Sequence, residues 1–376
     1  MLLEVGTDQR FFLDTTVRFL DERVPADALR ALRHDPLGYD PAFWREAAQL
    51  GWTSLLVDEA RGGGRLSDHG LVDLSLVAYE LGRHAAPGPL LATNVVAAAL
   101  DEHPGELGAA VLAELLEGTA TATWLPGTTS ALGAAATTVA VEELGDELVL
   151  RGGARAVDSV NGASYLLVTG RGEAGLTQVL LDAGAGGVSI APMRSVDLTR
   201  RLGAVTLDGV RVPRAAVVGE VGGAAAQAAR QRQIALAVGT AEMVGAMQAG
   251  FDMTVAWAFD RYAFGRPLAS YQEIKHRFAD MTTWLEASHA VSDAATQAAA
   301  KEAPEAEALL SAAKAYVGQF GSELLQDCVQ IHGGIGVTFE HDLHLFLRRH
   351  TLGRALLGTP AEHRQLLADL ETEAGR

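Results

Sequence analysis

The sequence predicts an α+β fold that is mainly α and has three regions. From the N-terminus to about residue 120, apolar residues recur at helical spacing, whereas short β-type runs occupy about 121–220 and long helical segments follow from about 221. The chain has 376 residues and is 48% hydrophobic, which is enough for two or three packed domains. We therefore predict domains over residues 1–120, 121–220 and 221–376.

The first region is predicted to be helical. Leu71, Leu74, Val77 and Leu81 are three and four positions apart, so they lie on one face of a helix. Glycine-rich breaks separate such stretches, and one of them, Gly62–Gly64, lacks the lysine that a P-loop uses. This region therefore carries no sign of a phosphate-binding loop.

The second region contains short runs of β-branched and other apolar residues. They cover residues 147–150, 165–168, 178–181 and 204–207. Asp208-Gly209 separates the last run from Val210-Arg211-Val212, and this dipeptide favours a hairpin turn. Pro213 is expected to end the following strand because proline cannot donate to the ladder.

The third region contains four helical segments with an apolar stripe at i, i+3 or i+4, and i+7. They run through residues 234–257, 274–285 and 309–324, and the last begins near Leu343. Their short connections place neighbours antiparallel, so a C-terminal four-helix bundle is predicted.

The composition argues against two classes of partner. The formal net charge is −17 and the pI is about 5.0, so phosphate backbones and anionic lipids repel the chain. The N-terminus lacks the features of a signal peptide, and no run approaches 18 uninterrupted apolar residues. We expect a cytoplasmic protein that binds neither nucleic acid nor membranes. The single cysteine, Cys328, lies in an apolar-periodic stretch and is predicted to be a buried packing residue.

An arginine-containing segment follows the first bundle helix. Residues 261–268 read Arg-Tyr-Ala-Phe-Gly-Arg-Pro-Leu, with Gln272 shortly after them. Arg261 and Phe264 are three positions apart, and the Gly-Arg-Pro that follows makes the loop rigid. Such a loop presents a guanidinium fork to a phosphate, although a helix–helix turn with an arginine ion pair fits the same residues.

A glycine-rich segment lies at the end of the third bundle helix. Residues 330–336 read Gln-Ile-His-Gly-Gly-Ile-Gly. Gly333 and Gly334 allow backbone N–H groups to approach an anion closely, and Gln330 adds an amide. A glycine helix cap gives the same pattern. Because no strand precedes the segment and no lysine follows it, it is neither a Rossmann fingerprint nor a P-loop.

Together these two segments resemble the acyl-CoA dehydrogenase family. The family's bundle carries Arg-x-x-Phe-Gly-x-Pro-Leu-x-x-x-Gln-x-Ile with Ala-Asp-Met following, and also Gln-x-x-Gly-Gly-x-Gly. Both patterns stand here at matching spacing. Residues 50–52, 80–83 and 210–213 agree as well, so the resemblance spans nearly the whole chain.

The resemblance implies an N-terminal helical domain, a central β-barrel-like domain and a C-terminal four-helix bundle. It also implies FAD as cofactor and an acyl-CoA thioester as substrate. In that family the two bundle segments reach across a subunit interface to the pyrophosphate and adenine half of a neighbour's FAD. The matching cofactor-binding residues are Arg261, Phe264, Gln272, Gln330, Gly333 and Gly334. A dimer or tetramer is then required.

The sequence departs from the family at the catalytic base. The family reaction removes a proton α to the thioester carbonyl while a hydride leaves Cβ for the flavin, and a glutamate takes the proton. Most members place it in a Tyr-Glu-Gly-Thr segment, which here reads Leu356-Leu357-Gly358-Thr359, and the second family position falls near Arg232. Neither Leu357 nor Arg232 accepts a proton, so no catalytic residue is predicted.

The flavin-ring segments of the family also differ here. Where the family has Thr-Glu-Pro-x-Ala-Gly-Ser-Asp and Trp-Ile-Thr-Asn, this chain has Trp-Leu-Pro-Gly-Thr-Thr-Ser at 124–130 and Ala-Val-Asp-Ser-Val-Asn at 156–161. Residues for a neighbour's FAD are kept while ring contacts are reduced. This asymmetry resembles the non-catalytic subunit of heteromeric actinobacterial acyl-CoA dehydrogenases, which act on bulky CoA esters such as sterol side-chain thioesters.

Alternative functions stay open at this point. A flavin monooxygenase or another biosynthetic enzyme on the same fold needs no α-proton base, and a cofactor-free interaction subunit needs no flavin. The partner is either a paralogous subunit or a second copy of the chain. His341 and His344 are one helical turn apart, as a metal site requires, but they coincide with the start of the family's fourth bundle helix. We therefore predict no metal site.

Overall fold

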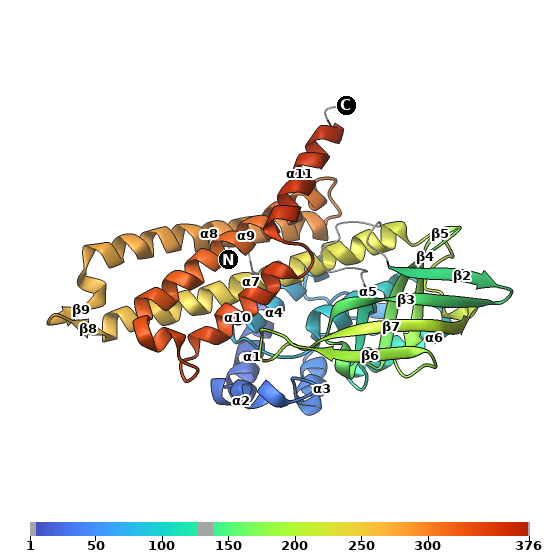
Figure 1. Ribbon diagram of the computed structural model, residues 1–376, viewed down its shortest axis with the longest axis horizontal. Coiled ribbons are helices and arrows are strands. Elements are labelled where there is room, and N and C mark those ends of the chain that lie inside the picture. Colours follow the sequence, from blue (N-terminus) through green and yellow to red (C-terminus); the bar gives the residue numbers. More distant parts are fainter. Residues whose placement is uncertain (1–4, 126–137, 375–376) are drawn as a thin grey trace.

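The computed structural model describes residues 5–125 and 138–374 and confirms a mainly α, α+β fold. Figure 1 shows long helices extending toward one end of the molecule and the sheet at the other. The N-terminal helices, in blue and cyan, lie below and behind them in this view.

The first part of the chain is helical, as predicted. Its helices are α1 (Thr7–Arg23), α2 (Ala26–Ala31), α3 (Pro41–Gln49), α4 (Gly70–Arg83), α5 (Leu90–Glu102) and α6 (Glu106–Glu117). Local sequence explains the start of α3, because the Asp40 side chain accepts a hydrogen bond from Ala42 N at 2.9 Å and proline occupies the first helical position.

The central strands form one mixed seven-stranded sheet. The strands are β1 (Ala122–Leu125), β2 (Val139–Leu144), β3 (Glu147–Asp158), β4 (Tyr165–Gly172), β5 (Gly175–Asp182), β6 (Val188–Met193) and β7 (Leu202–Pro213). The order is β1-β4-β2-β3-β7-β6, and β5 pairs with β4. The sheet folds around its own apolar core, which includes Leu150, Val168 and Val205.

The hairpin predicted at Asp208-Gly209 is wrong. Strand β7 continues through this dipeptide and pairs with β3 on both sides of it. Leu150 lies opposite Val210 and Arg151 lies opposite Asp208, so Gly209 is an extra residue on β7, with φ 66°. The dipeptide is therefore a β-bulge. A left-handed glycine suits both structures, and the partner strand β3 decides between them.

The C-terminal region contains the four predicted bundle helices and one more. They are α7 (Ala225–Asp260), α8 (Gln272–Ala300), α9 (Ala306–His332), α10 (Leu343–Ala355) and α11 (Pro360–Ala374). A small hairpin, β8 (Tyr262–Ala263) and β9 (Arg266–Pro267), joins α7 to α8. Residues 356–359, which we call the elbow, separate α10 from α11, and Figure 1 shows α11 projecting away from the bundle.

Helix α7 is the central helix of the molecule. It is apolar and long enough to resemble a membrane span by length and composition, but 78% of its most apolar window is buried inside the protein, so it packs as a core helix. It crosses α4 closely. A Cβ on Gly245 would lie 2.0 Å from the Tyr79 carbonyl oxygen, and one on Gly82 would lie 2.0 Å from the Glu242 carbonyl oxygen.

One apolar core unites the N-terminal helices with the bundle. Trp52 of the N-terminal region, Val96 of α5, Val244 of α7 and Val317 of α9 belong to the same cluster of buried residues. The chain enters the sheet after α6 and leaves it at Pro213, near the predicted divisions. Because the helical regions share a core, the division into three domains remains a prediction.

Candidate functional site

A cavity of about 230 Å³ lies where the sheet, α5, α7 and the elbow meet. One wall is a row of small α7 residues that includes Ala228, Ala235 and Gly239. The charged side chains that line it are Arg155, Asp158, Arg200, Arg232, Glu242, Lys314 and Arg349. A largely apolar pocket with a few convergent polar groups is the usual form of a small-molecule site.

Both positions at which a base was expected line this cavity. Leu357 projects from the elbow with φ 61°, and Arg232 lies on the second turn of α7. The Arg232 guanidinium is ion-paired with Glu307 of α9. The structure thus brings together two positions that are 125 residues apart in sequence (357 minus 232), and neither side chain can take up a proton.

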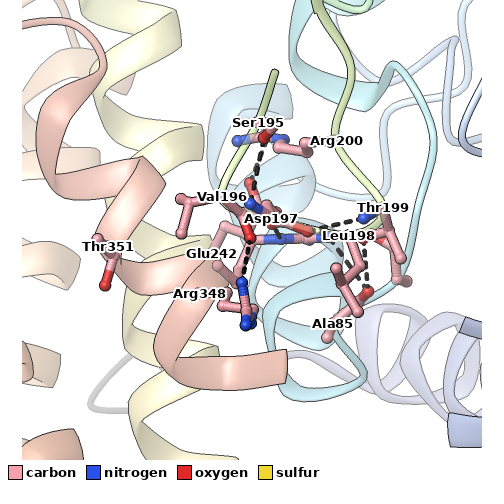
Figure 2. Close-up of polar contacts among 12 residues, drawn as sticks. Ala85, Ser195, Val196, Asp197, Leu198, Thr199, Arg200, Glu242, Arg348 and Thr351 are labelled. Carbon is pink, nitrogen blue, oxygen red and sulfur yellow. Dashed lines mark hydrogen bonds and ion pairs between the residues drawn. The ribbon is translucent and has the colours of Figure 1, made fainter. Parts of the chain in front are cut away.

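A buried network of charged groups adjoins the cavity, and Figure 2 shows part of it. Arg349 of α10 donates to Asp197, to Glu242 of α7 at 2.6 Å and to the backbone oxygens of Ala85 and Ala86. Burial alone raises the pKa of Asp197, but the adjacent Arg349 guanidinium holds it below its ordinary value. Asp197 is therefore a stable anion in the network.

The two carboxylates that line the cavity share a second arginine. Arg200 Nη2 lies 3.3 Å from Asp158 and 3.2 Å from Glu242. Burial raises the pKa of Asp158, and Arg200 opposes this shift. Sequence reasoning missed the network. A signal was present, because Glu242 and Arg349 are charges on otherwise apolar helix faces, but nothing in one sequence pairs them.

The predicted residues of the first bundle segment lie on the β8–β9 hairpin and on either side of it. Arg261 directly follows α7, and its guanidinium lies over the Trp257 ring at 5.9 Å. Phe264, at the hairpin tip, is 99% exposed and has φ 51°. Gln272 is exposed and begins α8. All three are open to a ligand or a second chain.

The second segment lies at the same end of the bundle. Helix α9 ends at His332, and Gly333 is the cap residue, with φ 65°. A Cβ on Gly333 or Gly334 would meet nothing within 4 Å, so both backbones are open to a ligand. The Trp257 ring stacks on His332 at 5.3 Å and also contacts the Arg261 guanidinium, so it joins the two segments.

The bundle segments lie away from the cavity of the same chain. Met243 is the last α7 residue that lines the cavity, and Arg261 follows it by 18 positions, which on an α-helix is about 27 Å. Figure 1 likewise places β8 and β9 at the end opposite the sheet.

Comparison with known proteins settles the family. The acyl-CoA dehydrogenase N-terminal domain matches residues 6–119, and the C-terminal domain matches residues 222–370. The chain is 30% identical to the acyl-CoA dehydrogenase IpdE2 of Mycolicibacterium smegmatis over 98% of its own length and 99% of that protein. The chain belongs to the acyl-CoA dehydrogenase family. FAD is the cofactor of this family.

Solved acyl-CoA dehydrogenase structures agree with this fold. A variant of the Tcur3481-Tcur3483 steroid acyl-CoA dehydrogenase superimposes with a TM-score of 0.89 and 27% identity, covering 99% of each chain. The ChsE4-ChsE5 complex of Mycobacterium tuberculosis gives a TM-score of 0.88 at 22% identity, covering 99% of each chain, and shows the likeness of fold.

The acyl-CoA dehydrogenase cofactor fits one part of this chain better than another. Arg261 and the open backbones of Gly333 and Gly334 suit the phosphates of FAD. On the cavity side, Asp158 stands in the segment that the family uses for ring contacts, and it is held by Arg200. Of the other ring segment, residues 124–130, Trp124 lines the cavity and residues 126–130 lie outside the described residues.

Two further sequence predictions concern reactive side chains. Cys328 is fully buried, as predicted, and burial raises the pKa of its thiol to about 12, so it is unreactive. His341 accepts from Leu343 N, and the His344 ring bonds the Phe339 carbonyl. Within residues 5–125 and 138–374, no group of three or more histidine, cysteine or carboxylate side chains is arranged to hold a metal.

Proposed function

We propose that this chain is a subunit of an FAD-dependent acyl-CoA dehydrogenase that forms an α,β double bond in a CoA thioester. It works together with a paralogous subunit and contributes residues to the partner's FAD across the interface. The partner supplies the catalytic base. This proposal refines the membership of the family, which by itself supports an oxidoreductase.

The observation that carries the proposal is the position of Leu357 and Arg232. Both lie on the cavity wall, where the family places its glutamate, and neither is a base. The carboxylates of Asp158 and Glu242 line the same cavity, but both are held by Arg200. No described carboxylate on the cavity wall is therefore free of a cation.

The energetic consequence is large. A positioned general base contributes about 10²–10⁴ in rate, which corresponds to roughly 3–5 kcal/mol of barrier. Bound FAD accepts the hydride in this family. In this chain, Arg232 and the small residues of α7 line the cavity and would supply no proton acceptor to such a reaction. A chain without the proton acceptor is a poor dehydrogenase by itself.

The exposed bundle end supports the second part of the proposal. Arg261, Phe264 and the backbones of Gly333 and Gly334 face outward, about 27 Å along α7 from the cavity. Residues placed this way suit a cofactor held mainly by another subunit. The likeness to a steroid acyl-CoA dehydrogenase favours a bulky CoA ester as substrate.

Purification of the chain alone and with the paralogous acyl-CoA dehydrogenase subunit of the same genome tests the proposal. We expect the lone chain to hold little FAD and to desaturate acyl-CoA esters slowly, and the mixture to form a flavoprotein complex with at least about 100-fold higher rate. Full flavin loading and an ordinary rate for the lone chain would refute the subunit assignment. A base-deleted partner is the control, because it should leave the complex flavin-loaded and slow.

A further inference from the structure

Lys314 of α9 is a buried ammonium group with a specific set of acceptors. It is 2% exposed and lines the cavity. Its Nζ donates to the backbone oxygens of Gly353 at 2.8 Å, Arg354 at 3.2 Å and Gly358 at 3.0 Å. An ammonium group has three donors, so this geometry uses all of them.

These acceptors lie on both sides of the point where helix α10 ends. Gly353 and Arg354 belong to the last turn of α10, whose carbonyls have no partner within the helix. Gly358 lies beyond the helix, in the elbow. A cation at a helix C-terminus is also favoured by the helix dipole. Lys314 therefore ties the end of α10 to the far side of the elbow.

Other groups of the elbow are bonded as well. The fully buried His363 ring donates from Nε2 to the Leu357 oxygen at 2.9 Å. Thr359 N donates to the Glu362 carboxylate at 2.7 Å, which caps α11. The elbow is thus fixed from α9 and from α11.

The bonds hold Leu357 in an unfavourable conformation. Its φ is 61°, in the left-handed region, which is unfavourable for a residue other than glycine. Such a conformation persists where the surroundings over-determine it. Here the strained backbone turns the Leu357 side chain onto the cavity wall.

We infer that Lys314 is a positioning residue: it holds the elbow so that the side chain of residue 357, whatever its type, is presented to the cavity. The assignment rests on the geometry of this chain and holds whether or not the chain needs a partner for activity. The elbow is rigid, and the type of residue at position 357 sets the chemistry of that part of the cavity wall.

A thiol placed at position 357 reports the rigidity of the elbow. In Leu357→Cys the new thiol faces the cavity, while the native Cys328 is buried and serves as an internal measure of global opening. A methyl thiosulfonate is small enough to react with it. A maleimide on a bulky fluorophore is expected to react at least about tenfold more slowly, because the wall is fixed.

The decisive comparison adds Lys314→Met to this variant. We expect the bulky reagent to react at least about tenfold faster, with Cys328 still protected. Lys301→Met, which removes an exposed lysine at the end of α8, is the matched control and should change nothing. An unchanged rate in Lys314→Met, or an equal rise in Lys301→Met, would overturn the inference.

A milder variant is used if Lys314→Met does not fold. Lys314→Gln keeps similar length and two N–H donors, so it should raise the rate of the bulky reagent by a smaller factor. If Cys328 becomes reactive in parallel with the thiol at position 357, Lys314 has no specific role in positioning residue 357.

Discussion

Arg349 shows how a single side chain sets the form of the cavity. Its five N–H donors meet Asp197, Glu242, Thr199 and the backbone oxygens of Ala85 and Ala86. Figure 2 shows these partners arriving from different segments of the chain. The guanidinium therefore joins α10 to α7, to the connection after α4 and to the loop between β6 and β7.

Removal of this arginine is expected to be costly. Arg349→Met leaves Asp197 and Glu242 buried with fewer cations, so we expect a loss of about 3–5 kcal/mol in the free energy of unfolding. Arg348→Met is the matched control. Arg348 is the neighbouring, more exposed residue and bonds only the Val196 oxygen among the described contacts, so its loss should cost under about 1 kcal/mol. Chemical denaturation measures both, and equal losses would contradict this account.

The buried His350 ring is expected to make the stability of the fold sensitive to acid. Burial lowers its pKa to about 4, against an ordinary value of 6.5. The unfolded chain therefore takes up a proton below pH 6.5 while the folded chain does not, so stability is full above pH 6.5 and falls as the pH drops toward 4.

One substitution measures how much His350 contributes to the pH dependence of the unfolding free energy. Between pH 8 and pH 5, His350 costs about 2 kcal/mol of unfolding free energy. His350→Leu should remove that part of the pH dependence, whatever its effect at pH 8. Denaturant titrations at both pH values supply the comparison. A pH dependence identical to that of the parent would show that His350 already titrates normally in the fold.

At the scale of elements, α7 organises both ends of the molecule. Its first five turns line the cavity, its last residues lead into the β8–β9 hairpin, and its middle crosses α4. The crossing depends on glycine, since Gly245 meets the Tyr79 oxygen and Gly82 meets the Glu242 oxygen. The position of the cavity relative to the N-terminal helices therefore depends on this close approach.

Two glycines on α7 should respond oppositely to the same change. Gly245→Ala places a methyl group 2.0 Å from the Tyr79 oxygen and forces the helices apart, at a cost of about 1–3 kcal/mol. Gly239→Ala meets only the Leu91 side chain, at 3.6 Å, and should be neutral or stabilising by up to about 1 kcal/mol. Thermal unfolding compares them. Similar shifts of Tm would show that the crossing tolerates a Cβ.

At the scale of the whole molecule, the two candidate sites lie at opposite ends of the chain's fold. The cavity lies beside the sheet, and the two family segments lie together at the far end of the bundle, joined by Trp257. Under the proposed function, this separation allows the residues at one end to change without altering those at the other.

Arg261→Ala tests the proposed FAD-binding role of the β8–β9 end of the bundle in the assembled complex. Loss of one charge-assisted hydrogen bond to a phosphate costs about 1.5–3 kcal/mol, so we expect FAD to bind the complex roughly 10- to 100-fold more weakly. The stability of the lone chain should not change, because the Arg261 side chain is exposed. Arg10→Ala, at an exposed arginine of α1, is the control. Equal FAD affinity in the Arg261→Ala and parent complexes, measured by flavin fluorescence, would remove Arg261 from the cofactor site.

Most of the fold was accessible from sequence because the signals are local. Helical spacing indicated the bundle helices, and alternation and β-propensity indicated strands β3, β4, β5 and β7. The error at Asp208-Gly209 was also local in origin, since a left-handed glycine suits a turn and a bulge equally well. The shared core of the N-terminal and bundle helices had no local signal.

The sequence by itself determined the family and which residues replace its glutamate, because motif spacing and residue type can be read along the chain without its three-dimensional structure. Tertiary structure alone decided that Leu357 and Arg232 face one cavity, that Arg349 and Arg200 hold its carboxylates, and that Lys314 fixes the elbow. Lys314 and Gly358 are 44 positions apart in the sequence, and Arg349 and Asp197 are 152 positions apart. Burial and long-range pairing arise only when distant segments pack, so no local pattern encodes them.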